Sequence, residues 1–324
     1  MVESMRIGAK FGGDMPINET IELAIFAEKA GYDSLWVNES RYTRDAVTRI
    51  SAIAAVTNRA ALGTAVLNPY TRSLMLLAIT AGSIDEISRG RFILGMGVGT
   101  RKYLSSEGIR PSNQLTRLQE YVLLMRRLWS GETVSFKGET LNLSDAKLDF
   151  KPIRPRIPIY FGATEERGIR LAANIADGII LNGYTSKSHA RSVKDLLSRE
   201  RADHLHLLGN VMVSIDDDQE AAIEGARQLA YTYFTSIPTI ANANGISHDF
   251  IEELKSLERK TGIDNAMKHL PDYMITDAVA TGTPEQCRKW IRDYSQSGLQ
   301  EVLITRIHGD TRRMIREISE LNTD

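Results

Sequence analysis

Charged and polar side chains stand at the ends of several short apolar runs in this 324-residue chain. Lys10 ends the run RIGAK, Glu39 and Ser40 follow SLWVN, and Asn68 and Arg72 lie just beyond LGTAV. Carboxylate, ammonium and hydroxyl groups can take or give a proton, and an amide can bind the polar edge of a ligand. These residues are candidates for acid–base chemistry or ligand binding if the fold brings them together.

The composition excludes several classes of protein. Lys and Arg number 40 against 41 for Asp and Glu, so the net charge of −1 offers no surface for nucleic acid. Cys287 is the single cysteine, which rules out an internal disulfide and a cysteine metal cluster, and the six histidines show no metal-ligand motif. The start MVESMRIGAKF does not read as a signal peptide, and no apolar run approaches ~20 residues. We expect a cytoplasmic protein without a metal, a membrane span or a nucleic-acid partner.

Short apolar runs alternate with longer amphipathic ones along most of the chain. Strands are predicted at residues 6–12, 34–38, 60–66, 91–97, 157–161, 178–181, 205–213 and 301–305. Helices are predicted at residues 17–30, 45–57, 73–88, 115–129, 165–174, 187–200, 217–235 and 284–297. Eight strand–helix units in a chain of this length predict an α/β fold, a (β/α)8 TIM barrel with insertions. A doubly wound open sheet is the alternative.

Two segments interrupt this rhythm. Residues 132–148 alternate in polarity like a β-hairpin around Lys137 and Gly138. Residues 237–280 carry NANG, a charged helix and PDYMITDAV, and are predicted to form a long insertion before the last unit. No linker of the kind that separates domains is present, so residues 1–324 are predicted to form one domain.

The stretch LGTAVLNPYTR lies where the third strand ends, and in a barrel of this type ligands bind at the carboxyl ends of the strands. The small residues Ala65 and Val66 would let the backbone approach a flat ligand, and Asn68 would offer its amide to the polar edge of that ligand. The alternative is a strand followed by an Asn-Pro turn, which needs no ligand. Spacing alone leaves both interpretations open.

Three stretches together carry a resemblance: LGTAVLNPYTR, SIDEISRGRFILGMGVG and IPIYFGATEERGIRLAANIADGIIL. They are similar to the bacterial luciferase-like superfamily, and within it to the coenzyme F420-dependent branch that includes methylenetetrahydromethanopterin reductase and F420-dependent glucose-6-phosphate dehydrogenase. The resemblance covers residues 6–235 and returns at TGTPEQCRKWIRDYSQSGLQEVLI. It implies a luciferase-like (β/α)8 barrel, usually a homodimer, that binds a flavin or deazaflavin at the carboxyl ends of the strands.

The resemblance also implies which residues contact the cofactor. The third strand should bulge through a non-prolyl cis peptide at Ala65–Val66 that backs the central ring, with Asn68 hydrogen-bonded to the pyrimidine edge. The cofactor-binding residues implied in this way are Asn38, Thr64, Ala65, Val66, Asn68, Gly97, Gly99, Thr100, Gly162, Ala163, Thr164, Glu165, Arg167, Gly168 and Asn182.

The turn GATEE at residues 162–166 precedes a predicted helix, whose free amides suit a phosphate. The resemblance places the phosphate of the cofactor there, with Arg167, Gly168 and Asn182 nearby. The alternative is an ordinary strand–helix turn capped by Thr164. The glycines of GMGVG resemble a dinucleotide fingerprint only superficially, because neither a third glycine nor an acid at the expected spacing follows them.

Three positions depart from the pattern of the family. Close relatives carry a carboxylate where this chain has Lys10, often an Asp-His pair where it has Glu39 and Ser40, and commonly an acid where it has Thr100. These departures argue against assigning either reference activity to this chain. Glu39, Ser40 and Lys10 remain as the candidate catalytic residues, with Glu39 the best remaining carboxylate for handling a proton or orienting the cofactor.

The same polar groups also have a structural interpretation. Lys10 and Glu39 could form an ion pair across adjacent strand ends and merely satisfy two partly buried charges. Arg72, Arg101 and Lys102 would suit an anionic substrate or a polyglutamate cofactor tail, and the alternative is a set of solvated side chains. Arg41 and Ser40 complete this polar set.

Three functions follow from the resemblance. The first is an oxidoreductase that transfers hydride between coenzyme F420 and a small organic substrate that the sequence does not identify. The second is an FMN-dependent monooxygenase of the same superfamily. The third is a barrel that binds a flavin without catalysis, since the expected acid–base positions have changed.

Overall fold

The structure is a computed structural model that describes residues 5–40 and 42–322, with only the backbone of Lys102 and Asn322. Arg41 therefore lies outside the described residues. The chain divides into two compact units. Unit 1 comprises the described residues of 1–9, 164–166 and 181–324, and unit 2 comprises those of 10–163 and 167–180.

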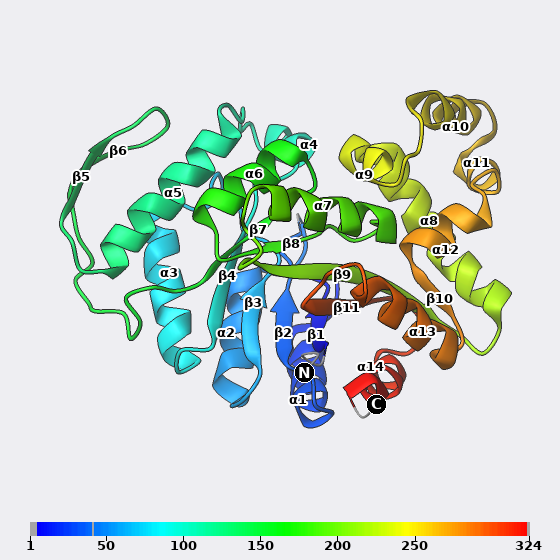
Figure 1. Ribbon diagram of the computed structural model, residues 1–324, viewed down its shortest axis with the longest axis horizontal. Helices are drawn as coiled ribbons and strands as arrows, with labels where there is room; N and C mark the ends of the chain where they lie inside the picture. Colours follow the sequence, from blue (N-terminus) through cyan, green and yellow to red (C-terminus); the bar gives the residue numbers. More distant parts are fainter. Residues whose placement is uncertain (1–4, 41, 323–324) are drawn as a thin grey trace. The chain divides into compact units, whose positions relative to one another are not determined.

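Eight strands form the barrel sheet (Figure 1). They are β1 (Arg6–Phe11), β2 (Ser34–Val37), β3 (Ala61–Thr64), β4 (Phe92–Met96), β7 (Ile159–Gly162), β8 (Gly178–Ile180), β9 (His206–Ile215) and β11 (Glu301–His308). The order is β9-β11-β1-β2-β3-β4-β7-β8, and β9 pairs with β8 as well as with β11, so the sheet closes. The predicted (β/α)8 barrel is confirmed, and the open doubly wound sheet is excluded. A short ninth strand, β10 (Ala280–Gly282), pairs with the end of β9.

A helix follows each barrel strand, as the apolar periodicity predicts. The helices of this repeat are α1 (Ile17–Lys29), α2 (Ala46–Val56), α3 (Leu74–Ile87), α5 (Gln114–Trp129), α6 (Glu166–Ile175), α7 (Lys187–Arg199), α8 (Gln219–Ser236), α13 (Pro284–Ser295) and α14 (Thr311–Ser319), with the short α4 (Arg101–Ser106) and the 3-10 turn η1 (Glu320–Asn322). Local sequence sets several of their starts. The side chains of Asp45, Ser73 and Ser186 each accept a hydrogen bond from a free amide of the first turn. Thr283 and Gln286 form a capping box at the start of α13.

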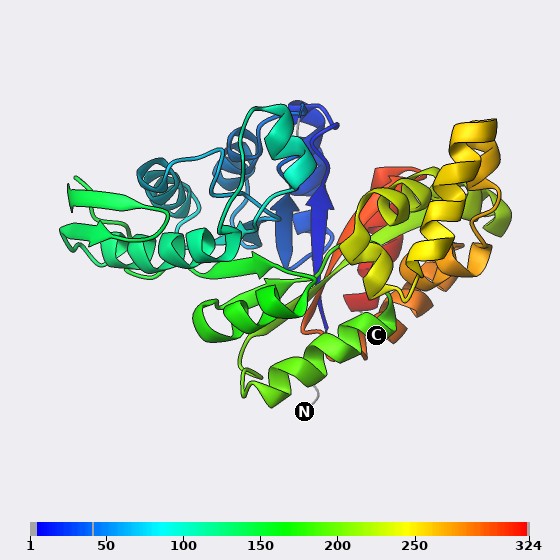
Figure 2. The same ribbon diagram turned by 90° about the horizontal axis from the view of Figure 1, so that it is seen from above.

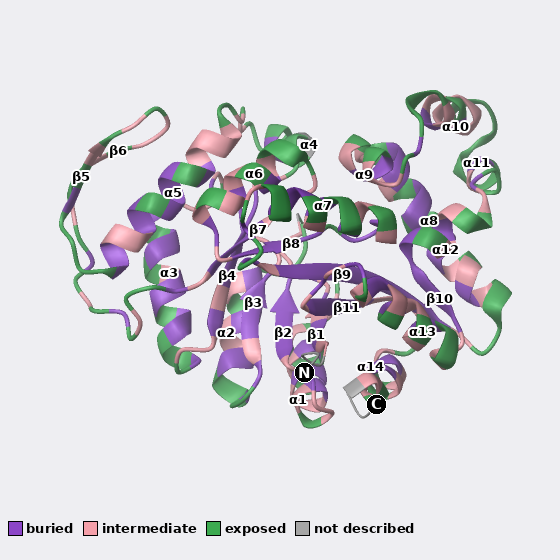
Figure 3. Ribbon diagram, viewed as in Figure 1, coloured by how far each residue is buried: buried purple, intermediate pink, exposed green. Residues whose placement is uncertain are grey.

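The strands are buried along most of their length (Figure 3). Trp36 of β2 is fully buried, and its ring lies 2.2 Å from where a Cβ would stand on Gly63 of β3. Only glycine fits at position 63 beside this indole, so the small residues of the run ALGT have a packing reason. The Trp36 ring also lies 6.2 Å, centroid to centroid, from the ring of Tyr160 on β7.

An antiparallel hairpin occupies the predicted segment at 132–148. Its strands are β5 (Val134–Lys137) and β6 (Asn142–Ala146), and it lies beside α5 in Figures 1 and 2. The buried carboxylate of Glu120 on α5 accepts hydrogen bonds from the amides of Glu139 and Thr140 at 2.7 and 3.1 Å. Arg117 of α5 also donates to the carbonyl of Thr140 at 3.3 Å, so side chains of α5 attach the hairpin turn to this helix.

The segment predicted as an insertion folds as four helices: α9 (Pro238–Ala243), α10 (His248–Thr261), α11 (Ile263–Met267) and α12 (Asp272–Ala278). They lie together with α8 in unit 1, coloured yellow to orange in Figure 2. Tyr184, Phe234 and Ile275 belong to the apolar cluster beneath them. Arg227 of α8 donates to the carbonyl of Leu270 at 2.7 Å, which attaches the start of α12.

None of the helices in the described part of the chain combines the length and the apolar character needed to cross a bilayer.

Candidate functional site

The third strand ends in the predicted bulge. Ala65–Val66 is a cis peptide bond without proline, as predicted. The amide of Ala65 still donates to the carbonyl of Val37 on β2 at 2.8 Å, and Leu67 bridges to Met96 on β4. Residues 65 and 66 therefore stand out of the regular ladder at the carboxyl end of β3, where a (β/α)8 barrel binds its ligands.

The side chain of Val66 explains two glycines that the sequence assigns to the cofactor. A Cβ on Gly97 would lie 2.7 Å from Cγ2 of Val66, and one on Gly162 would lie 3.0 Å from Cγ1. The first distance is shorter than carbon–carbon contact allows, and the second is at the tight end of such contacts. Val66 therefore excludes a side chain at Gly97 unless it shifts, and it leaves little space for one at Gly162.

Two residues of the predicted site, Thr64 and Asn68, form side-chain hydrogen bonds within the protein. The Thr64 hydroxyl donates to the carbonyl of Gly95 and accepts from its amide, both at 3.0 Å. Oδ1 of Asn68 accepts from the amides of Tyr70 and Thr71 at 3.0 and 3.2 Å. The predicted Asn-Pro turn therefore forms and uses Oδ1 of Asn68. Of the two polar atoms of this amide, Nδ2 is the one that remains to bind a ligand. The nearest acceptor of Nδ2 is Oε2 of Glu39, at 3.5 Å.

Glu39 forms an ion pair, but not with the partner proposed from sequence. Nη2 of Arg72 lies 3.0 Å from its Oε1, and the same nitrogen lies 2.5 Å from Oδ1 of Asp45, the N-cap of α2. Burial alone would lower the pKa of Arg72, but the two carboxylates raise it above its usual value. The suggested Lys10–Glu39 pair is wrong because Arg72 reaches Glu39 from the loop after β3. Arg72 is likewise not a solvated side chain.

Arg49 of α2 is fully buried and was not singled out from sequence. Its Nη1 donates to the carbonyls of Phe11 and Gly12 at 3.1 and 2.8 Å, and its Nη2 donates to the carbonyl of Asn38 at 2.5 Å. Burial lowers the pKa of Arg49. This guanidinium joins the ends of β1 and β2. Its signal in the sequence is an arginine at a core position of the helical period set by Ala46, Ile50 and Ile53.

Lys10 lies near the end of β1, between the buried residues Ala9 and Phe11, and is partly buried. Within the described residues its ammonium has no hydrogen-bond or ion-pair partner, and desolvation lowers the pKa of Lys10 to about 8. On the next strand end, Nδ2 of Asn38 donates to the Ser40 hydroxyl at 2.5 Å. Oδ1 of Asn38 is buried and has no partner in the described part of the chain. One donor and one acceptor are thus open at adjacent strand ends.

The predicted phosphate turn lies at 162–165, directly before α6. Nδ2 of Asn182 lies 3.3 Å from the Thr164 hydroxyl, so these two predicted residues are neighbours in unit 1. Glu165 and Arg167 are exposed. A Cβ on Gly168 would lie 3.4 Å from the side chain of Ala163, an ordinary van der Waals contact, so packing does not require glycine there.

The remaining predicted residues follow β4. Gly99 has a φ of 74°, a conformation that favours glycine, and Thr100 is the exposed N-cap of α4. Arg101 is exposed, and nothing is described of the Lys102 side chain.

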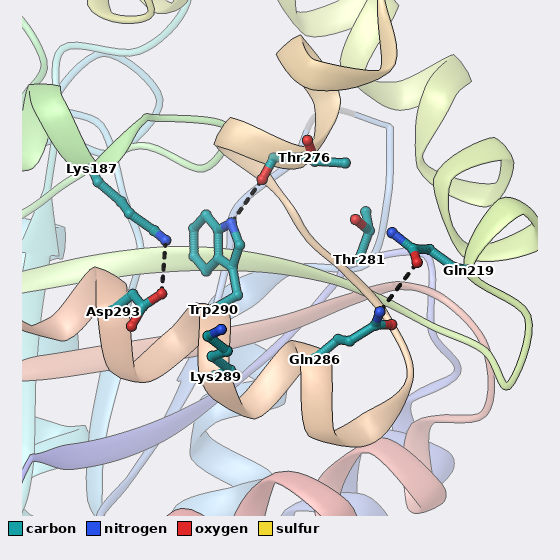
Figure 4. A pocket seen from close by; sticks show the side chains of 8 residues that line it. All are labelled: Lys187, Gln219, Thr276, Thr281, Gln286, Lys289, Trp290 and Asp293. Carbon is teal, nitrogen blue, oxygen red and sulfur yellow. Dashed lines mark hydrogen bonds and ion pairs between the residues drawn. The ribbon is translucent and has the colours of Figure 1, made fainter.

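A groove of about 210 Å³ lies elsewhere, on unit 1, around Trp290 of α13 (Figure 4). Several of its polar groups are paired with one another. The Trp290 indole donates to the carbonyl of Thr276 at 2.8 Å, Lys187 lies 3.5 Å from Asp293, and Gln286 donates to Gln219 at 3.1 Å. The groove lies away from the strand ends that hold Lys10 and Asn38.

Comparisons with known proteins agree with this geometry. The family described as luciferase-like monooxygenase matches residues 3–301. A 5,10-methylenetetrahydromethanopterin reductase of Archaeoglobus fulgidus is 30% identical over 92% of each chain. An F420-dependent glucose-6-phosphate dehydrogenase of Nakamurella multipartita is 31% identical over 65% of this chain and 67% of its own.

Solved structures show the same fold. The coenzyme F420-dependent tetrahydromethanopterin reductase of Methanopyrus kandleri superposes with a TM-score of 0.87, at 20% identity over 98% of both chains. The family match spans more than half of the chain, and the Archaeoglobus fulgidus relative aligns over nearly all of it. This chain is a member of the luciferase-like monooxygenase family.

Proposed function

We propose that this protein is an oxidoreductase that transfers hydride between coenzyme F420 and a small organic substrate. The observation that carries the proposal is the 31% identity to an F420-dependent glucose-6-phosphate dehydrogenase over 65% of this chain. A deazaflavin such as F420 supplies two-electron hydride chemistry when bound, and the protein supplies position and electrostatics.

The residues at the strand ends fit such a group. The buried Oδ1 of Asn38 lacks a hydrogen-bond donor within the described residues, and an N–H on a pyrimidine edge would provide one. In this proposal Nδ2 of Asn68 donates a hydrogen bond to the same pyrimidine edge. Ala65 and Val66, at the bulge, are small and apolar residues, which suit a flat ring face.

The phosphate of the cofactor is assigned to the turn at 162–165 and the N-terminus of α6. Ten residues of α6 align their dipoles toward this end, and its first amides have no partner within the helix. Asn182 and Arg167 would add hydrogen-bond donors. Two glutamates, Glu165 and Glu166, stand at the same point, so we assign the contact to the backbone amides rather than to side-chain charge.

The candidate catalytic groups divide into two kinds. Glu39 is held by Arg72 and lies beside Asn68, so its role is to orient its neighbours. Ser40 accepts a hydrogen bond from Asn38 and helps to orient that amide. Lys10 is the group left open for proton transfer, since its ammonium has no partner within the described residues.

Direct titration of the pure protein with F420 and with FMN, each oxidised and reduced, tests the cofactor assignment. We expect F420 to bind at least about tenfold more tightly than FMN, a difference of ~1.4 kcal/mol. Tighter binding of reduced FMN, followed by oxygen consumption, would instead assign the monooxygenase activity for which the family is named. Binding of neither cofactor would contradict both functions.

We also propose that the protein forms a homodimer through the outer face of α3. The side chains of Leu76, Ile79 and Ile87 on this helix are 49%, 41% and 46% exposed and form an apolar stripe. Contact of such a stripe with water is unfavourable, so a second copy of the chain would stabilise it by covering it. Light scattering should give a dimer mass for the wild type and a monomer for Ile79→Glu. A monomeric wild type at micromolar concentration would reject this interface.

A further inference from the structure

The ammonium of Lys10 is the least compensated charge at the ends of β1 and β2. Alternation along β1 places it on the opposite face from Ala9 and Phe11, which are 1% and 2% exposed. Lys10 therefore lies on the other face of β1, and it has no partner in the described part of the chain.

Four of the acceptors near these strand ends are already in use, whereas the buried Oδ1 of Asn38 has no partner within the described residues. Glu39 and Asp45 share Arg72, and the carbonyls of Gly12 and Asn38 accept from Arg49. Since none of them turns to Lys10, its hydrogen-bonding capacity of three N–H groups stays open for a ligand.

The charge balance points the same way. Arg49 directs its hydrogen bonds to carbonyls, and the charges of Asp14, Asp45 and Arg44 act on it. Arg72 and Arg49 together balance the carboxylates of Glu39 and Asp45, and Arg44 and Asp14 add one charge of each sign, so the ammonium of Lys10 is the charge that remains uncompensated. A cationic ligand beside Lys10 would meet net repulsion, whereas a carbonyl or carboxylate oxygen would meet an ammonium donor.

We propose that Lys10 binds the oxygen of the hydride-accepting group, so that the substrate is a neutral or anionic carbonyl compound, or its alcohol in the reverse direction, and not a cationic iminium compound. This inference rests on the proposed function and adds the substrate class to it.

The step balances with the two reactants already named. Hydride from the reduced cofactor forms a C–H bond at the carbonyl carbon, and the electron pair of the C=O π bond moves to the oxygen. Lys10 donates a proton to that oxygen, which leaves a hydroxyl group and a neutral amine that water reprotonates. The cofactor is oxidised and the carbonyl is reduced by two electrons. Burial, which lowers the pKa of Lys10 to about 8, makes this proton easier to release at neutral pH.

The first experiment measures whether a ligand oxygen covers Lys10. The protein, with and without F420, is acylated briefly with acetic anhydride, and the labelled fraction of Lys10 is read by mass spectrometry of its peptide. Three probes of similar shape are added in turn: isobutyrate, isobutyramide and isopropylammonium. We expect isobutyrate and isobutyramide to slow acylation of Lys10 by about fivefold or more near saturation, as mass action requires, and isopropylammonium to have no effect. Exposed Lys29 serves as the internal control for reagent competition.

The second experiment changes the charge of the residue. Lys10→Met should weaken isobutyrate binding by about tenfold or more, and Lys10→Glu should bind isopropylammonium in preference to isobutyrate. Lys10→Arg should keep isobutyrate binding but lose turnover of pyruvate or acetone with reduced F420, because guanidinium does not release a proton near neutral pH. Lys29→Met is the matched control and should behave as the wild type.

The results separate the two proposals. If F420 does not bind but isobutyrate still protects Lys10, the proposed function fails while the oxygen site at Lys10 stands. If F420 binds and no probe protects Lys10 in either form, the inference about Lys10 is overturned. Equal or stronger protection by isopropylammonium would overturn it as well.

Discussion

Arg72 lies 3.0 Å from Glu39, with its Nη2 on Oε1 of the carboxylate, and the same nitrogen reaches Asp45 at 2.5 Å. One guanidinium from the loop after β3 thus holds the end of β2 and the N-cap of α2. The side chains of Arg72 and Glu39 are only 16% and 18% exposed, so water screens their interaction little.

Removing Arg72, the cation that two carboxylates share, should lower the free energy of unfolding more than removing the charge of Glu39. We expect Arg72→Met to lower the free energy of unfolding by about 1–3 kcal/mol, because it leaves two carboxylates without their counterion. Glu39→Gln should lower the free energy of unfolding by less, since Arg72 still forms its ion pair with Asp45. Urea denaturation of both single variants and the double variant gives the coupling energy directly. Equal stability of Arg72→Met and the wild type would show that the ion pair contributes nothing.

Asp45 should contribute to acid sensitivity. Burial would raise the pKa of Asp45, but hydrogen bonds from Thr48 together with the hydrogen bond and charge of Arg72 lower it overall. Its stabilisation is therefore present above the unfolded-state pKa of ~3.9 and is lost as pH falls through the lower folded-state value. Unfolding followed from pH 6 to pH 2 should show a shallower acid limb for Asp45→Asn than for the wild type. Superimposable acid limbs would contradict this role.

Lys10 should be a destabilising residue at neutral pH. Its pKa falls from 10.5 to about 8 in the folded state, so below pH 8 the folded protein keeps a charge in an unfavourable site. Lys10→Met should raise the free energy of unfolding at pH 7 by about 1–3 kcal/mol.

The pH dependence of this effect has a definite sign. Between about pH 8 and 10.5 the unfolded chain keeps the Lys10 proton that the folded protein has lost, so the wild type gains stability with rising pH. The advantage of Lys10→Met over the wild type should shrink across that window, while Lys29→Met should show no such trend. A constant difference from pH 7 to 10 would mean that Lys10 titrates normally.

Val66 and Gly97 should be energetically coupled. A methyl group on Gly97 would lie 2.7 Å from Cγ2 of Val66, so Gly97→Ala is expected to destabilise the protein by about 1–3 kcal/mol through overpacking. Val66→Ala removes the obstructing methyl groups and should recover most of that loss in the double variant. Strict additivity of the two changes, measured by thermal unfolding, would place the conflict elsewhere.

The phosphate assignment can be tested by charge reversal. Arg167→Glu, in the first turn of α6, should weaken F420 binding by about tenfold at low salt, because it places a negative charge beside the proposed phosphate position. Arg170→Glu changes the charge by the same amount one turn further along the helix and should have a smaller effect. Fluorescence titration at two salt concentrations measures both. Identical F420 affinity of the two variants and the wild type would show that the phosphate does not bind at this turn.

The sequence by itself determined the barrel and most of its elements. The runs of small and branched residues at 91–97 and 178–181 and the helical period of 17–30 are local patterns, and each appears in the structure within a few residues of its predicted bounds. Alternation and periodicity depend on neighbours in the chain, so they can be read without knowing the fold. The cis bond at Ala65–Val66 was also predicted, from the resemblance carried by LGTAVLNPYTR.

Only the tertiary structure decided which groups of the site meet. Sequence reasoning suggested a pair of Glu39 with Lys10 and passed over Arg49, whereas the structure pairs Glu39 with Arg72 and bonds the strand-end carbonyls to Arg49. The physical reason is the length of the arginine side chain. The guanidinium of Arg72, 33 residues away in sequence, contacts the carboxylate of Glu39, whereas Lys10 on the adjacent strand does not. Partner choice depends on where side chains end in space, and spacing along the chain does not contain that information.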